Sequence, residues 1–195
     1  VANDINHSRT LALADNVQRW GLGNVVVTCN EPAHIGSFEE WFDVVAVDAP
    51  CSGEGMFRKE PETVNEWSMA NVELCAARQR RILQDIWPAL APGGYLVYST
   101  CTFNHFENDG NLQFLINEMG AESVDVAGLA GNSDYGTILK TPHGGFQFVP
   151  GMVEGEGQFF AIVKKSTLCG EKSRFRIPGL KPSGNLLKKF PYLPS

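Results

Sequence analysis

The sequence has no long hydrophobic run and no paired cysteines. None of its apolar stretches approaches the roughly 20 residues that a membrane-spanning helix requires, and its N-terminal region lacks the charged and then apolar layout of a signal peptide. The 5 cysteines, an odd count, include no C-x-x-C pair, and the 4 histidines are not spaced with them as zinc ligands. We therefore expect a soluble, cytoplasmic protein with reduced thiols and no metal site.

Basic residues are scarce over most of the chain. The net charge is -6, and residues 1–163 contain 8 lysines and arginines against 21 aspartates and glutamates. Residues 164–195 reverse this balance, with 8 basic residues and 1 acidic residue. A basic segment after an acidic body can track phosphates, although a solvated linker has the same composition. Charge alone therefore leaves a nucleic-acid partner open.

The order of the periodic segments predicts an α/β fold. Short β-branched runs alternate with helical patterns, which is typical of an open, mostly parallel sheet that binds ligands beyond the carboxyl ends of its strands. The strands are expected at residues 1–5, 24–29, 42–48, 95–99 and near 123–126, with a hairpin of edge strands at 145–149 and 158–165. The helices are expected at residues 7–20, 68–90 and 104–119, the second closed by a turn at 92–94.

The chain divides near residue 165. Residues 1–165 carry the strand and helix patterns and predict one compact domain. Residues 166–195 lose this periodicity and gain 4 prolines, so we expect a basic linker or the start of a C-terminal RNA-binding domain. The chain opens at Val1 in what reads as a strand end, and we also expect its first domain to be N-terminally truncated.

Two cysteines follow two of the predicted strands. One lies in the sequence DAPCSGEG (48–55) and the other in STCT (99–102). If the strands are neighbours, Cys51, Cys101 and Asp48 converge at one end of the sheet. A lone cysteine is most often a small buried hydrophobe, and a lone aspartate here is an ordinary turn residue. Two cysteines at equivalent strand ends favour a functional site.

The stretches DAPCSGEGMFRK (48–59) and YSTCT (98–102) together resemble the paired signature of the RNA 5-methylcytosine methyltransferases of the Sun/nucleolar-protein family. The similarity extends over about residues 1–165, and the GEGMFRK extension resembles the bacterial 16S ribosomal RNA enzymes of the F type. The resemblance implies a Rossmann-like methyltransferase fold, S-adenosylmethionine as cofactor, and an RNA substrate, 16S rRNA or the small ribosomal subunit. We expect a monomer; a transfer RNA substrate stays open.

The chemistry explains the need for two thiols. Carbon 5 of cytosine is a poor nucleophile, so a thiolate must first add to carbon 6 of the ring. In the enzymes this chain resembles, the cysteine at the position of Cys101 is the nucleophile, and the one at Cys51 assists release of the product. Asp48 is expected to bond the N3 edge of the ring and to share a proton with it. The residues alone do not decide which thiol is the nucleophile and which assists release of the product.

The cofactor-binding residues are also expected at strand ends. Asp4 follows the first strand, where an acidic residue in this fold accepts hydrogen bonds from a ribose diol, and the resemblance assigns it to the ribose of S-adenosylmethionine. Asn30 or Glu31, after the next strand, is the candidate for the adenine edge, although both are also ordinary turn residues. Asp48 and Pro50 complete the predicted cofactor contacts.

Arg58 and Lys59 follow the loop that carries Cys51 and are candidates for RNA phosphate contacts, although exposed basic residues are most often only solvated.

The family carries a glycine-rich cofactor loop after a strand, which would lie upstream of Val1. The sequence at 21–23 follows a helix and does not replace that loop. We therefore expect the chain to lack its first strand and, by itself, to be an incomplete or very weak enzyme.

Two other functions are compatible with parts of the sequence. A non-catalytic RNA-binding or ribosome-assembly module could keep the fold, although retention of both cysteines and Asp48 argues against it. An adenine amino-methyltransferase would need an aromatic side chain to stack the base. Cys51 stands where that aromatic side chain would be.

Overall fold

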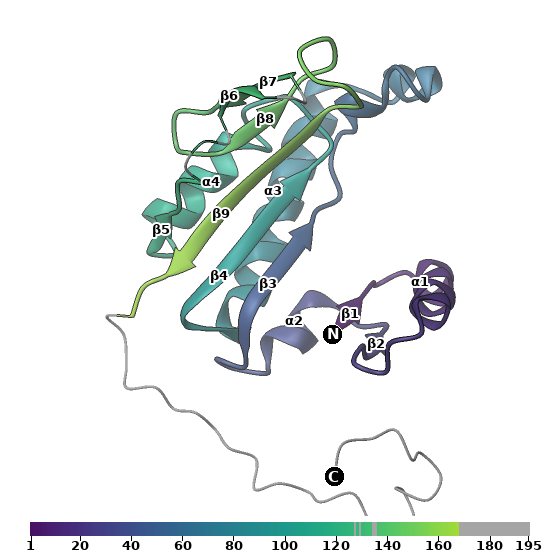
Figure 1. Cartoon of the computed structure of the whole chain (residues 1–195), viewed down its shortest axis with the longest axis vertical. Helices are drawn as coiled ribbons and strands as arrows, with labels where there is room; N and C mark the ends of the chain where they lie inside the picture. The colour runs from purple at the N-terminus through teal and green to yellow at the C-terminus, as the bar shows by residue number, and fades with distance from the viewer. Residues whose placement is uncertain (127, 129, 134–135, 168–195) are drawn as a thin grey trace, which may run out of the picture. The chain divides into compact units, whose positions relative to one another are not determined.

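The computed structural model describes residues 1–126, 128, 130–133 and 136–167 of the chain. These residues form two compact units, which in the described part of the chain are residues 1–35 and 36–167 (Figure 1). Within that part, no helix combines the length and the apolar character that a bilayer crossing needs. The predicted linker at residues 166–195 falls almost wholly outside the described residues.

The first unit is a small strand, helix and strand arrangement. Strand β1 (Ala2–Asn3) pairs in parallel with β2 (Val27–Thr28), and α1 (His7–Trp20) connects them. The helix begins where the Asn6 side chain accepts two backbone N–H groups and ends at Gly21, whose φ of 77° is in the left-handed region. The predicted bounds of this helix are confirmed, whereas β2 is shorter than the predicted strand. A short helix, α2 (Pro32–Gly36), follows.

The second unit is built on a mixed sheet. Its strands are β3 (Phe42–Asp48), β4 (Leu90–Thr100), β5 (Ala121–Ser123), β6 (Gly131–Ser133), β7 (Gly136–Lys140), β8 (Phe146–Phe148) and β9 (Gln158–Lys165). Their order is β3-β4-β9-β8-β7-β6, and β5 also pairs with β9. Strands β3 and β4 are parallel, while the other pairings between these strands are antiparallel. The α/β class is confirmed, but the sheet is mixed rather than mostly parallel.

Strand β9 occupies a central position, so its prediction as an edge strand is wrong. It lies between β4 on one side and β5 and β8 on the other. Phe159, Ala161 and Val163 are buried and alternate with more exposed neighbours, which is the pattern of a strand with one face on the core. The hairpin that β8 and β9 form was predicted correctly.

Helices cover the face of the sheet that carries this core, and in Figure 1 they lie behind the strands. Helix α3 (Met69–Ile86) is capped by the Ser68 hydroxyl, continues into the short turn η3 (Trp87–Ala89), and buries a stripe of side chains at helical spacing: Val72, Ala76, Gln79, Leu83 and Ile86. Helix α4 (Asp109–Asn117) packs beside α3. The loops beyond β3 contain two short helical turns, η1 (Glu54–Met56) and η2 (Pro61–Asn65).

Two boundaries differ from the prediction for identifiable reasons. The expected turn at residues 92–94 lies inside β4, where the register with β3 shifts and Gly93 adopts a φ of 78°. Helix α4 begins at Asp109 rather than at 104, because the Asn104 side chain accepts the N–H of Glu107 and holds this stretch as a loop.

Candidate active site

The two cysteines meet at the carboxyl ends of β3 and β4. The two strands are paired in register up to Asp48 and Ser99, and Ala49 N–H donates to the Ser99 carbonyl at 2.9 Å. The chain leaves both strands at the same edge, which brings Cys51 Sγ to 3.0 Å from Cys101 Sγ across fifty residues of sequence. Both side chains are half-buried.

The two thiols have opposite protonation preferences. The hydrogen bond from the Cys51 S–H lowers the pKa of Cys101 to about 7, although burial and the nearby Asp48 carboxylate act in the opposite direction. The same contact raises the pKa of Cys51, and burial and the charge of the Cys101 thiolate add to that rise. The contact therefore favours ionisation of Cys101 over that of Cys51, which keeps its proton.

Asp48 lies at the last position of β3, beside the cysteine pair. Its side chain is exposed, and its Oδ1 accepts a hydrogen bond from the Ser99 hydroxyl at 3.1 Å. A carboxyl group with solvent access keeps oxygen lone pairs beyond this contact for hydrogen bonds to a ligand. Pro50, also exposed, follows on the same loop.

Glu54 ties the loop after β3 to the loop after β4. Its Oε2 accepts from the Thr102 hydroxyl at 2.8 Å and from the backbone N–H groups of Phe103 and Asn104 at 2.7 and 2.8 Å. Its Oε1 accepts from Trp67 Nε1 at 2.9 Å. Burial alone would raise the pKa of Glu54, but these hydrogen bonds outweigh it and lower the pKa.

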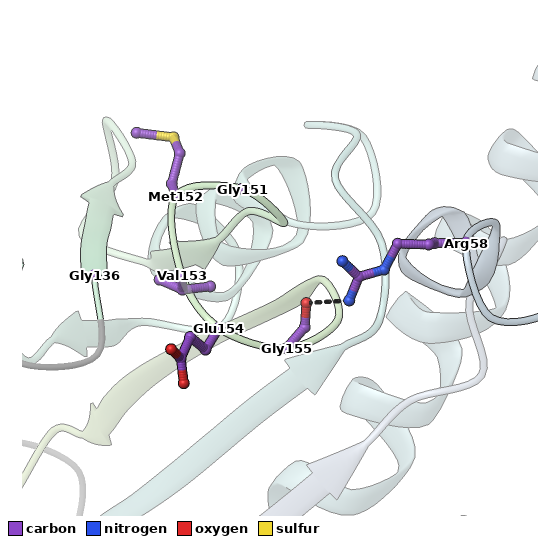
Figure 2. Close-up of a pocket in the computed structure, with 7 residues that line it drawn as sticks. All are labelled: Arg58, Gly136, Gly151, Met152, Val153, Glu154 and Gly155. Atoms are coloured by element: carbon purple, nitrogen blue, oxygen red, sulfur yellow. Dashed lines mark hydrogen bonds between the residues drawn. The ribbon is translucent and has the colours of Figure 1, made fainter.

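Arg58 and Lys59 follow η1 and are exposed. The Arg58 guanidinium already has partners, because it donates to the Glu156 carboxylate at 2.9 and 3.3 Å and to the Gly155 carbonyl at 2.9 Å. Figure 2 shows the hydrogen bond from Arg58 to the Gly155 carbonyl, and both residues line a pocket of about 540 Å³. The pocket is lined by Arg58, Gly136, Gly151, Met152, Val153, Glu154 and Gly155, so neither cysteine lines it.

The candidate cofactor residues of the first unit lie at the carboxyl ends of β1 and β2. Asp4 accepts from Asn6 N–H at 2.7 Å and pairs with Arg9 at 3.0 Å, and the Asn6 N–H makes the largest contribution to lowering the pKa of Asp4. Asn3 and Asn30 hold the two strand ends together by hydrogen bonds of 2.9 and 3.0 Å. An ionised carboxylate has lone pairs beyond these contacts, so Asp4 fits a ribose diol. Glu31 immediately precedes α2.

Sequence reasoning missed the buried polar residues behind the cysteines. Gln79, Glu107 and Asn111 are fully buried and hydrogen-bonded to one another. One signal for them was available: Gln79 stands within the apolar stripe of α3, where a polar side chain needs a partner. In the described part of the chain, no group of histidine, cysteine or acidic residues is arranged to hold a metal ion.

Solved structures with the same fold place the chain among the Rossmann-like methyltransferases. A methyltransferase homolog protein from Pyrococcus horikoshii is 27% identical, with a TM-score of 0.68, over 84% of this chain and 52% of that chain. NSun6 from Pyrococcus horikoshii with SFG is 25% identical, with a TM-score of 0.67, over 84% of this chain and 40% of that chain.

The model of the family described as 16S rRNA methyltransferase RsmB/F matches residues 1–164, and the chain belongs to this family. Ribosomal RNA small subunit methyltransferase F of Aliivibrio fischeri (strain MJ11) is 35% identical over 100% of this chain and 39% of its own length. The enzyme of the same name from Aliivibrio salmonicida (strain LFI1238) is 37% identical over 86% of this chain and 35% of its own length. The chain thus spans less than two fifths of these curated relatives, and the predicted family is confirmed.

Proposed function

We propose that this protein transfers a methyl group from S-adenosylmethionine to carbon 5 of a cytosine in RNA, with ribosomal RNA of the small subunit as the substrate class. The observation that carries the proposal is the 3.0 Å contact between Cys51 Sγ and Cys101 Sγ at the ends of two paired strands. The names of the Aliivibrio relatives, ribosomal RNA small subunit methyltransferase F, support the choice of substrate.

Cys101 is proposed as the nucleophile because the hydrogen bond from Cys51 lowers its pKa to about 7. Its sulfur adds to carbon 6 of the cytosine ring while the carboxyl group of Asp48, in its protonated form, gives its proton to N3, so that the ring electrons become available at carbon 5. When bound, S-adenosylmethionine supplies the methyl group as a sulfonium electrophile. The target cytosine must be unpaired or flipped out, since its carbon 5 and carbon 6 are inaccessible inside a stacked helix.

Cys51 is proposed to assist release of the product. After methyl transfer, a base removes the carbon 5 proton, the bond between carbon 6 and Cys101 Sγ breaks, and the N3 proton returns to Asp48. The departing sulfur leaves as a thiolate. A Cys51 S–H whose sulfur lies 3.0 Å from Cys101 Sγ donates a hydrogen bond to that thiolate and so stabilises it.

The remaining site residues are proposed contacts. Asp4 would hold the ribose of the cofactor, Asn30 or Glu31 the adenine edge, and Asp48 and Pro50 would complete the cofactor contacts. Arg58 and Lys59 are proposed to meet RNA phosphates. Residues 1–165 would form the catalytic part, and residues 166–195 a basic linker or the start of an RNA-binding domain.

Covalent trapping tests the proposal. RNA that contains 5-azacytidine should form a stable adduct with the full-length protein in the presence of S-adenosylmethionine, because the substituted ring cannot lose a carbon 5 proton. Cys101→Ala should abolish this adduct, whereas Cys51→Ala should accumulate an adduct with ordinary RNA. The exposed Cys29 provides the matched control, and Cys29→Ala should behave as the unchanged protein. Absence of an adduct in both the 5-azacytidine and the Cys51→Ala experiments would refute the scheme.

A further inference from the structure

A buried carboxylate connects the loop after β3, which carries Cys51, with the loop after β4, which carries Cys101. Glu107 is 0% exposed. Its Oε2 accepts from Ser52 N–H at 3.0 Å and from Gln79 Nε2 at 2.6 Å, and its Oε1 accepts from Asn104 Nδ2 at 2.7 Å. All three donors are neutral groups. In the described part of the chain no basic side chain forms an ion pair with Glu107. Burying a carboxylate without a cation partner costs free energy, so its presence here calls for a reason other than stability.

This carboxylate and Gln79 hold the peptide groups on both sides of Cys51. Glu107 binds the N–H that follows Cys51, and Gln79 Nε2 donates to the carbonyl of Pro50, which precedes it, at 2.8 Å. The orientation of the Gln79 amide is fixed in turn, because its Oε1 accepts from Asn111 Nδ2 at 2.7 Å. Buried side chains therefore hold the backbone on both sides of Cys51 by hydrogen bonds.

Glu107 also belongs to the segment that follows Cys101. Its backbone N–H donates to Asn104 Oδ1 at 2.9 Å, and its carbonyl lies 2.7 Å from the Tyr98 hydroxyl of β4. The carboxylate thus joins the loop that carries Cys51 to the strand and loop that carry Cys101. A change in this link would alter the separation of the two sulfurs.

We infer that Glu107 is a positioning residue that holds Cys51 at hydrogen-bond distance from Cys101. Its expected effect on the reaction rests on the proposed function, whereas its effect on the sulfur separation does not. Glu107→Gln tests this with almost no change in volume. The amide NH₂ would face Ser52 N–H, Gln79 Nε2 or Asn104 Nδ2, all of which are donors, so the link between the loops would be weakened.

The first measurement is independent of methyl transfer. Diamide converts two neighbouring thiols into a disulfide by taking up two electrons and two protons, and the sulfurs at 3.0 Å need only a small movement to reach S–S bond length. In the full-length protein, Glu107→Gln should slow formation of the Cys51 to Cys101 disulfide about tenfold, measured by peptide mass spectrometry. Glu118→Gln, the same change at an exposed position that caps the end of α4, should leave the rate unchanged. Equal rates in all three proteins would overturn the inference.

The second measurement follows the adduct. We expect Glu107→Gln to displace Cys51 and to leave Cys101 intact. The variant should then still be trapped by 5-azacytidine RNA, and it should also accumulate an adduct with ordinary RNA. Its turnover should be about 10 to 100 times slower than that of the unchanged protein. Loss of trapping by a folded Glu107→Gln protein would overturn the inference. Absence of trapping by the unchanged protein, together with slower disulfide formation in the variant, would instead reject the proposed function and leave the positioning role standing. Should Glu107→Gln fail to fold, Glu107→Asp keeps the charge but shortens the link, and the same two measurements apply.

Discussion

The backbones of Gly55 and Gly157 pack against each other beside Cys101, in the loop after β4. A Cβ on Gly55 would lie 2.6 Å from the Gly157 carbonyl oxygen and 2.8 Å from that of Cys101. Gly55 N–H also donates to the Cys101 carbonyl at 2.8 Å. Three segments that are distant in sequence, the loops after β3 and β4 and the chain before β9, therefore come together where only glycine leaves room.

Gly55→Ala is expected to destabilise the protein, because the contacted atoms belong to backbone and cannot rotate away. We expect a loss of about 1 to 3 kcal/mol in the free energy of unfolding, measured by urea denaturation, together with reduced methyl transfer. Gly23→Ala is the control, since a Cβ there meets nothing within 4 Å and the backbone φ is not in the left-handed region. A Gly55→Ala protein as stable as the control would contradict the prediction.

Cys51→Ala should raise the pKa of Cys101. The hydrogen bond from Cys51 is the largest cause of the lowered value, about 7, and its removal leaves burial and the Asp48 charge, both of which raise the pKa. The rate at which iodoacetamide alkylates Cys101 at pH 7 should fall at least about fivefold and recover at alkaline pH. Cys29→Ala should keep the original pH profile. An unshifted profile in Cys51→Ala would show that the contact does not control the thiolate.

Glu54→Gln is expected to lower stability in a pH-dependent way. Because the pKa of Glu54 is lowered in the folded protein, its contribution is fully present above the unfolded value of about 4.5 and is lost as the pH falls through the folded value. At pH 7 we expect a loss of about 1 kcal/mol, limited by solvent screening of this half-buried group. The difference between the two proteins should shrink below pH 4.5, as thermal unfolding at several pH values would show. Glu66→Gln, at an exposed site, should show no such trend.

Lys59→Ala should weaken RNA binding more than Arg58→Ala. The Arg58 guanidinium is already engaged with Glu156, whereas the exposed Lys59 ammonium forms no ion pair within the described part of the chain. Loss of one phosphate contact should reduce the slope of log K against log salt by about 0.7 to 0.9, measured by fluorescence anisotropy with a short RNA. Lys140→Ala, which removes an exposed lysine paired with Asp125, is the control. A larger effect of Arg58→Ala would reverse this assignment.

Elements whose ends are set by neighbouring residues could be predicted from the sequence. Helix α1 begins at the Asn6 cap and ends at Gly21, and β3 ends at Asp48 before a proline and glycine loop, so each boundary has a local cause. The position of β9 has no such cause. Its place between β4 and β8 depends on pairing with strands about 60 residues and 10 residues away, and the alternation of its side chains is the same at an edge or in the middle of a sheet.

The same distinction applies to the site. Cys51, Cys101 and Asp48 could be brought together by reasoning from strand ends alone, because parallel neighbours end at one edge. Glu107 could not, since a glutamate near a helix start ordinarily faces water, and its partner Gln79 lies 28 residues away on another helix. Long-range polar contacts of this kind leave almost no trace in local periodicity.

The in-register pairing of Asp48 with Ser99 restricts how the length of this protein can change. Gaining or losing one residue within β3 or β4 would slide one sulfur along the sheet by about 3.3 Å and turn every following side chain to the opposite face. Such a shift would separate the thiols even if the composition of the site were untouched. The site therefore tolerates an inserted residue only at positions outside the paired part of β3 and β4, where the register between the two strands stays unchanged.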